Sequence, residues 1–111
     1  MSSRGRVRYM RLLVFFDLPV TTAIQRKRYA QFRKYLVKDG FLMVQQSVYS
    51  KLVINEAAAS GAVSRMRVHR PPEGLVQVLK VTEKQYATMS YITGSEAVRD
   101  EVDTMEEFLV L

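Results

Sequence analysis

Residues 8–19 read RYMRLLVFFDLP, and this stretch decides the fold. Every second residue from Met10 to Phe16 is apolar, which is the period of a β-strand that buries one face. The other face is half apolar and carries Tyr9, Arg11, Leu13, Phe15 and Asp17. Pro19 ends the strand because proline cannot donate a ladder hydrogen bond. The sequence therefore predicts a strand whose second face is also partly covered.

A helix is predicted next, from about residue 23 to residue 39. Thr21 or Thr22 is a suitable N-cap, and Gly40 supplies the C-terminal stop. At helical spacing one apolar stripe forms, which consists of Ile24, Tyr29, Phe32, Tyr35 and Leu36.

Residues 41–53 read as extended chain, interrupted at residues 45–47. The interruption is either a hairpin turn between two strands or a bulge in one bent strand, and we favour two strands. Asn55 caps a second helix that reaches about residue 67. The apolar stripe of this helix consists of Ala59, Ala62, Val63 and Met66.

A strand over residues 75–81 follows, with apolar side chains in both parities, as in a strand with two covered faces. Thr82 then caps a short helix to about residue 89, and residues 94–103 read as a polar loop. The apolar residues 108–111 predict a final docked strand.

The order of these elements predicts an α+β, ferredoxin-like βαββαβ sandwich with an extra C-terminal strand. The whole chain, residues 1–111, is one domain, with a core over about residues 8–93. Both helices would lie on one face of the sheet. A homodimer packed through the other face would cover its apolar side chains.

The charge is distributed unevenly along the chain. Residues 1–70 hold fourteen Lys and Arg against three acids, whereas residues 71–111 hold three against eight. A basic body of this kind is typical of proteins that bind phosphate backbones. The alternative is that these charges only keep the protein in solution.

Several classes of site are excluded. The chain has no Cys, so it has no disulfide, thiolate metal site or Cys nucleophile. His69 is the only histidine, which excludes multi-His metal sites within one chain and leaves little basis for a Ser-His-Asp triad. No Gly-rich phosphate loop is present, and the apolar run at residues 12–16 is too short to span a bilayer. We therefore expect a cytoplasmic protein without a membrane partner.

Asp17 is the candidate catalytic and metal-binding residue. It is the first acid of the chain and lies at the carboxyl end of an apolar strand, where sites are common in α/β proteins. The alternative is that Asp17 only caps a turn before Leu18 and Pro19. One carboxylate does not hold Mg²⁺ securely, so we expect two copies of Asp17 to share one divalent ion across a dimer.

The candidate nucleic-acid contacts are basic residues whose phosphate contacts would give affinity without sequence choice. They are Arg11, Arg26, Lys27, Arg33, Lys34, Lys38, Arg65, Arg67 and Arg70. The alternative is an ordinary solvated helix surface. A single-stranded RNA-binding module shares this predicted topology, although its aromatic signature is absent, and it stays as the competing function.

The stretch at residues 8–19 resembles the first strand of the CRISPR-associated Cas2 family, in its branch from type II loci. Further landmarks of that branch are Phe32-Arg33-Lys34, Gly40-Phe41, Gln46-Ser47-Val48-Tyr49 and Val81-Thr82-Glu83-Lys84-Gln85. The resemblance covers nearly the whole chain, from about residue 8 to residue 111.

The resemblance implies a ferredoxin-like homodimer whose C-terminal strand docks on the neighbouring protomer. It implies an adapter that holds duplex DNA and bridges subunits of the CRISPR integrase, Cas1, during spacer acquisition. It also implies a metal-dependent endonuclease acting on RNA or DNA, with Asp17 at the position of the family's strand-end aspartate. Integration itself does not need that activity in the family, so the resemblance favours the adapter over the enzyme.

Overall fold

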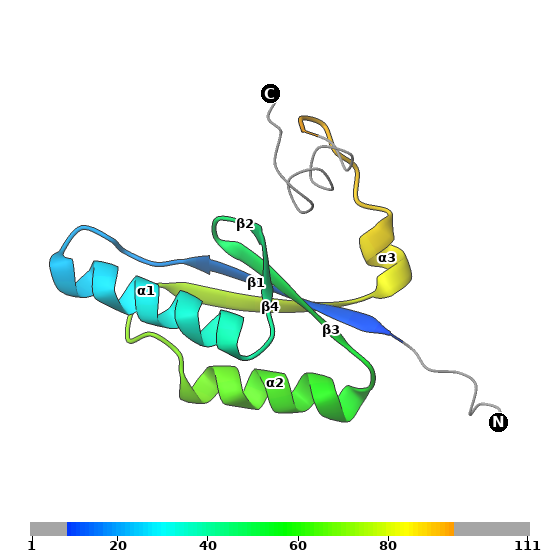
Figure 1. Ribbon diagram of the computed structural model, residues 1–111, viewed down its shortest axis with the longest axis horizontal. Helices are drawn as coiled ribbons and strands as arrows, with labels where there is room; N and C mark the ends of the chain where they lie inside the picture. The colour runs from blue at the N-terminus through cyan, green and yellow to red at the C-terminus, as the bar shows by residue number, and fades with distance from the viewer. Residues whose placement is uncertain (1–8, 95–111) are drawn as a thin grey trace.

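The computed structural model describes residues 9–94. Its elements are β1 (Met10–Asp17), α1 (Ala23–Lys38), β2 (Leu42–Gln45), β3 (Val48–Val53), α2 (Glu56–Val68), β4 (Leu75–Thr82) and α3 (Glu83–Ala87). The four strands form one antiparallel sheet in the order β2-β3-β1-β4. α1 and α2 lie on the same side of this sheet (Figure 1). The predicted α+β, ferredoxin-like arrangement is confirmed for these elements.

The N-terminus of α1 is fixed by local chemistry. The hydroxyl of Thr22 accepts a hydrogen bond from the backbone N–H of Gln25, whose side chain accepts one from the backbone of Thr22 in return. This capping box satisfies two backbone donors that a helix start leaves free. Thr22 is therefore the N-cap, and Thr21, the alternative from sequence, is not.

The interruption near residue 46 is a hairpin, so the choice of two strands is confirmed. β2 and β3 pair with Leu42 opposite Ser50 and Met43 opposite Tyr49. The register then shifts between Met43 and Gln45, so a bulge accompanies the hairpin.

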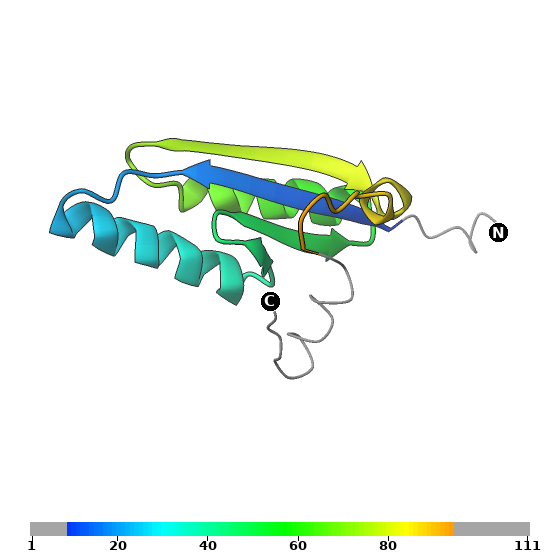
Figure 2. The same ribbon diagram turned by 90° about the horizontal axis from the view of Figure 1, so that it is seen from above.

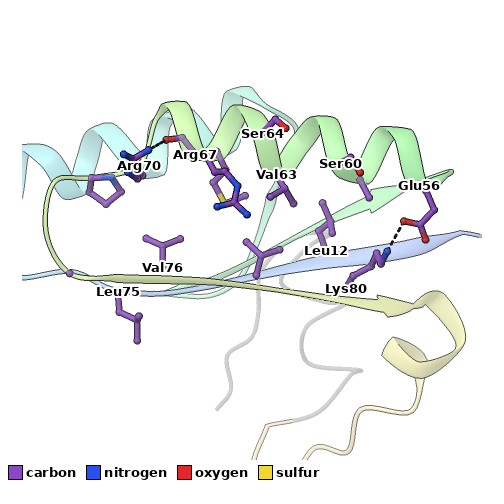
Figure 3. A pocket seen from close by; sticks show the side chains of 15 residues that line it. Leu12, Glu56, Ser60, Val63, Ser64, Arg67, Arg70, Leu75, Val76 and Lys80 are labelled. Atoms are coloured by element: carbon purple, nitrogen blue, oxygen red, sulfur yellow. Dashed lines mark hydrogen bonds and ion pairs between the residues drawn. The ribbon is translucent and has the colours of Figure 1, made fainter.

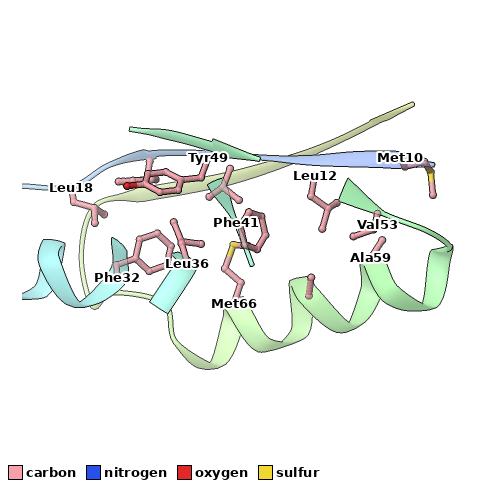
Figure 4. Close-up of a cluster of buried hydrophobic side chains, with 13 residues drawn as sticks. Met10, Leu12, Leu18, Phe32, Leu36, Phe41, Tyr49, Val53, Ala59 and Met66 are labelled. Atoms are coloured by element: carbon pink, nitrogen blue, oxygen red, sulfur yellow. The ribbon is translucent and has the colours of Figure 1, made fainter. Parts of the chain in front are cut away.

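The core lies between the sheet and the two helices (Figure 4). Leu12, Val14 and Phe16 of β1 are buried against it, as the alternation predicted. The Phe16 ring packs edge-on against Phe32 of α1 at 5.3 Å between ring centroids and also contacts Tyr49 at 5.7 Å. Aromatic pairs at such distances add to the free energy of area burial.

One member of the predicted α1 stripe lies outside the core. Ile24 is 56% exposed, although Phe32 and Leu36 of the same helix are buried. The reason is geometric, because the first turns of α1 extend past the ends of the neighbouring strands (Figure 2). The helical period is correct, but the sheet is too short to cover the whole stripe.

Within residues 9–94 of one chain only one face of β4 is covered, in line with the expectation that its other face needs a second copy of the chain to cover it. Leu75 and Leu79 are 54% and 51% exposed. Their side of the sheet faces away from α1 and α2. Among the described helices only α3 lies against it, at one end, where Arg11 of β1 binds Glu83 and lies over the Tyr86 ring. We call this side, which carries Leu13, Leu42, Leu52, Leu75 and Leu79, the open face.

The predicted loop at residues 94–103 and the predicted strand at residues 108–111 lie outside the described residues, apart from Gly94. Within residues 9–94, no helix has the length and apolar character needed to cross a membrane.

Candidate functional site

Asp17 is the last residue of β1 and belongs to the open face. It pairs with Leu75 of β4, as Leu13 pairs with Leu79 on the same face further along the strand. The residue is exposed, so its carboxylate is accessible to solvent and to ligands. The predicted place of Asp17 at the tip of the first strand is therefore correct.

Two turns lie next to Asp17. On one side, the backbone N–H of Phe16 donates to the carbonyl oxygen of Ser47 in the β2–β3 turn, over 3.1 Å. On the other side, Gly74 has φ of +95°, and a Cβ added there would lie 2.8 Å from the backbone oxygen of Asp17. Only glycine allows so close an approach in this backbone conformation. The two turns together fix the position of the strand tip.

One chain supplies a single carboxylate at this tip. No group of three or more His, Cys, Asp or Glu side chains occurs within residues 9–94 that could hold a metal ion. Mg²⁺ prefers several oxygen ligands in an octahedral arrangement. The described residues of one chain therefore do not make a complete magnesium site.

Two of the nine predicted nucleic-acid contacts are neutralised within the chain. The guanidinium of Arg11 donates two hydrogen bonds to Glu83, of 2.6 and 2.9 Å, and lies 4.5 Å from the centre of the Tyr86 ring. This contact holds the pKa of Glu83 below its usual value. Arg65 likewise donates to both carboxylate oxygens of Asp39, over 2.7 and 3.2 Å.

Asp39 also binds Lys51, so a single carboxylate joins α1, β3 and α2. Burial raises the pKa of Asp39, but the hydrogen bond from Arg65 and the charge of Lys51 outweigh burial and leave the pKa below its usual value. No sequence pattern indicated this cluster, because its members are far apart along the chain.

Three other predicted contacts are arginines that bind neutral oxygens and keep their full charge. Arg26 donates to the carbonyl oxygens of Val20 and Thr21 before α1, and Arg33 donates to the Tyr49 hydroxyl over 2.9 Å. Arg70 donates to the carbonyl oxygen of Arg67 over 2.7 Å. These bonds position the guanidiniums without cancelling their charge.

Lys27, Lys34 and Lys38 project from one side of α1, since they are seven and four residues apart along the helix. All three are exposed, and none has a hydrogen bond or ion pair to another residue in the range 9–94. We call these three residues the lysine stripe. The whole of α1 carries six basic residues and no acidic residue.

Arg67 and Arg70 line a groove of about 790 Å³ between α2 and β4. Figure 3 shows Arg70 at one end of this groove and the ion pair between Glu56 and Lys80, of 2.6 Å, at the other. Leu12, Val63 and Val76 form part of its apolar lining. The sequence placed both arginines at the basic end of α2 but did not indicate the groove.

Comparison with known proteins identifies the family. The model of the family "CRISPR associated protein Cas2" matches residues 10–89. A protein of Treponema denticola named CRISPR-associated endoribonuclease Cas2 is 53% identical over 102 residues, which cover 92% of this chain and all of the relative. Proteins of the same name from Streptococcus mutans and Ligilactobacillus salivarius are 46% and 39% identical. These alignments cover 77% and 92% of this chain, and 78% and 100% of the two relatives.

The resemblance inferred from residues 8–19 and the later landmarks is thereby confirmed. The matched range contains every described strand and helix, together with Asp17 and all nine predicted basic contacts. The chain belongs to the CRISPR-associated Cas2 family.

Proposed function

We propose that this protein acts as a homodimer in CRISPR spacer acquisition, where it binds duplex DNA and bridges subunits of the CRISPR integrase, Cas1. The observation that carries the proposal is the open face of the sheet. Four of its leucines (Leu42, Leu52, Leu75 and Leu79) are between 45% and 70% exposed in the single chain. A second copy packed on this face removes that apolar surface from water.

The same face explains why a second copy suits the chain better than an unrelated partner. An isologous contact brings each surface against itself, so a single apolar patch is enough to make both sides of the interface. Asp17 lies at the end of this face, paired with Leu75. A twofold axis near the strand tips would therefore place two carboxylates close together.

α1 supports the duplex-binding part of the proposal. The lysine stripe lies on the side of the sheet opposite the open face, so a dimer formed through the open face leaves it accessible. Its charge is not balanced by any acid of α1. Lysines arranged along a helix suit phosphate contacts, which supply affinity independent of sequence.

The test is a size analysis of this chain, the integrase encoded beside it and a short DNA duplex, by chromatography with light scattering. We expect the chain alone at the mass of a dimer and a larger complex when all three components are mixed. The Asp17→Ala variant should assemble equally well, because an adapter does not need the carboxylate. A chain that stays monomeric, or never enters the larger complex, contradicts the proposal.

The relatives' name, endoribonuclease, supports a second activity, cleavage of RNA. We propose that this cleavage depends on a metal ion. In this proposal the two Asp17 carboxylates of a dimer share one Mg²⁺, with water and phosphate oxygens as the other ligands. The exposed position of Asp17 at the end of the open face favours this arrangement. Within each chain, the turns at Ser47 and Gly74 hold the strand tip in place.

Calorimetric titration with Mg²⁺ tests the shared site. We expect about one ion for every two chains, because two carboxylates make one site. Asp17→Ala should abolish the binding, whereas Glu56→Gln, which removes an exposed carboxylate on α2, should not. Equal binding by the wild type and Asp17→Ala contradicts the shared site. Cleavage assays with RNA and with DNA then identify the substrate.

The competing function is a single-stranded RNA-binding module without catalysis. It shares the fold, but the basic residues of α1 favour phosphate contacts over base readout. Competition between duplex DNA and single-stranded RNA for the protein separates the two functions. If single-stranded RNA displaces bound duplex DNA more readily than the duplex displaces bound RNA, the RNA-binding module is favoured.

A further inference from the structure

A stacked pair of rings lies between the two long helices. The rings of Tyr35 on α1 and His69 at the end of α2 are 4.2 Å apart between centroids and only 12° from parallel. His69 is exposed, whereas Tyr35 is half-buried beneath it. Tyr35 covers one face of the imidazole, and His69 as a whole remains exposed to solvent.

The imidazole is held in one orientation. His69 is the C-cap of α2, and its backbone N–H donates to the carbonyl oxygens of Arg65 and Met66. The ring Nδ1 lies 2.9 Å from the same Arg65 carbonyl oxygen. A carbonyl can only accept, so Nδ1 carries the proton and donates it. A ring fixed by its own hydrogen bond and by a stacked neighbour loses little entropy when a ligand binds.

A cavity of about 360 Å³ adjoins this pair. The residues that line it include Pro71 and Pro72, together with the polar Gln31 and the basic Arg28 and Arg70. Arg28 forms a loose ion pair with Glu73, at 3.8 Å. Arg70 donates to a neutral backbone carbonyl, that of Arg67, so this bond does not cancel its charge. The cavity therefore combines a flat ring, apolar walls and two cations.

The cavity is close to the strand tip. The segment that forms its wall, residues 70–72, leads directly to Gly74, which contacts the backbone of Asp17 and Leu18. The wall of the cavity and the loop that packs against the strand tip therefore belong to one short stretch of chain.

We propose that His69, stacked on Tyr35 and flanked by Arg28 and Arg70, binds one unpaired nucleotide of a single strand. The base stacks on the imidazole, and the phosphate contacts the guanidiniums. An aromatic surface of this kind accepts any base, but only a base that is free of its own duplex stack. The inference rests on the proposed nucleic-acid-binding function and adds a site that the duplex contacts of α1 do not supply.

The only histidine of the chain provides a direct readout. In a nuclear magnetic resonance spectrum of this chain, the imidazole signals belong to His69 alone. We expect adenosine 5′-monophosphate to shift the ring protons upfield, because a stacked base lies over them, and inorganic phosphate to cause no such shift. Equal shifts from both ligands mean that the site binds an anion only, and this outcome, like the absence of any shift, overturns the proposal.

Two substitutions at one position separate stacking from the structural role of His69. His69→Phe keeps a ring but loses the donor to the Arg65 carbonyl, whereas His69→Gln keeps a donor but loses the ring. Stacking on one base contributes on the order of tenfold in affinity, so His69→Gln should weaken binding of short single strands by about that factor. His69→Phe should bind them nearly as the wild type does.

The test is completed by comparing duplex with single-stranded nucleic acid, and by comparing His69→Gln with a variant of the lysine stripe. His69→Gln should leave affinity for a DNA duplex unchanged, while Lys34→Ala should weaken duplex and single strand alike. RNA and DNA single strands of the same sequence show which sugar the site prefers. If His69→Phe binds as weakly as His69→Gln, or if duplex affinity falls equally, the stacking site is contradicted. Asp17→Ala should keep the imidazole shift, so failure of the metal site remains distinguishable.

Discussion

Asp39 shows how one residue can join three elements. Its carboxylate is only 13% exposed and accepts hydrogen bonds from Arg65 and Lys51. A carboxylate removed from water is destabilising by itself, and these two cations make its charged form favourable. The C-terminus of α1 is thereby attached to β3 and to α2.

The first prediction concerns this carboxylate. Asp39→Asn should lower the free energy of unfolding at neutral pH by about 1–2 kcal/mol, since two charged hydrogen bonds are weakened. The pKa of Asp39 is lowered in the folded protein, so its contribution is present above the ordinary value of 3.8 and is lost as the pH falls through the lower folded value. Urea unfolding of both proteins between neutral and acidic pH measures this. A variant with the same pH dependence as the wild type contradicts it.

The second prediction concerns Tyr35, whose hydroxyl is buried without a hydrogen-bond partner among the described residues. Burial raises the pKa of this hydroxyl. An unsatisfied buried polar group costs roughly 1–3 kcal/mol, so Tyr35→Phe should raise the unfolding free energy by up to about 1 kcal/mol once the weaker packing is included. The denaturant midpoints of the wild type and of Tyr35→Phe measure this change in stability. A Tyr35→Phe variant that is less stable than the wild type would mean that the hydroxyl has a hydrogen-bond partner in solution.

At the residue scale, the sequence located Asp17 but not the partners of the basic residues. A strand period and a following proline are enough to place Asp17 at a strand tip. Arg11 and Glu83, in contrast, are 72 residues apart and meet only because α3 begins directly after β4. The neutralisation of Arg11 and Arg65 is therefore a tertiary effect that local patterns do not contain.

Among the elements, α1 has two sides with different properties. Its inner side buries Phe32 and Leu36, and its outer side carries the lysine stripe. A helix with the two properties on opposite sides can contact a phosphate backbone without any change in the core.

The third prediction follows from this division. Replacing Lys27, Lys34 and Lys38 together by Ala should weaken duplex binding and reduce the slope of log affinity against log salt by about one unit for each phosphate that is no longer neutralised. Stability should change little, because all three side chains are exposed. Fluorescence anisotropy over a range of salt concentrations gives the slope. Lys84→Ala on α3 is the control, and an equal reduction in that variant argues against the stripe.

Element boundaries were largely predictable because their signals are local. The N-caps at Thr22, Asn55 and Thr82 are all observed, and each accepts a hydrogen bond from a backbone N–H in the first turn of its helix. The exposure of Ile24 was missed for a geometric reason. Periodicity shows which side of an element is apolar, but the extent of the neighbouring layer decides how much of that side is covered.

For the whole molecule, the main feature is a sheet with helices on one side only. The order of strands and helices along the chain is enough to predict this arrangement, since two βαβ-type crossovers place both helices together. In the proposed dimer, the molecule that covers the open face is a second chain, and no pattern within one chain specifies which chain that is.

The fourth prediction belongs to this scale. Leu79→Glu should convert the proposed dimer into a monomer, because a charge buried at an interface without a partner costs several kcal/mol. The side chain is half exposed in one chain, so the monomer should keep its fold. Light scattering and circular dichroism report the two properties. Lys84→Glu is the matched control, because Lys84 lies on α3 and is not one of the leucines of the open face. If the Leu79→Glu variant is still a dimer, the interface lies elsewhere.

Gly74 sets a limit on how this strand tip can vary. The space between the loop and β1 is narrower than a methyl group, with Leu18 Cδ2 only 2.7 Å and the Asp17 oxygen 2.8 Å from where a Cβ would stand. Any larger side chain there would force the Leu18 side chain, the Asp17 carbonyl or the loop itself to move. The position of the Asp17 carboxylate at the strand tip therefore depends on the lack of a Cβ at residue 74, so a single added carbon atom in this loop can disturb it.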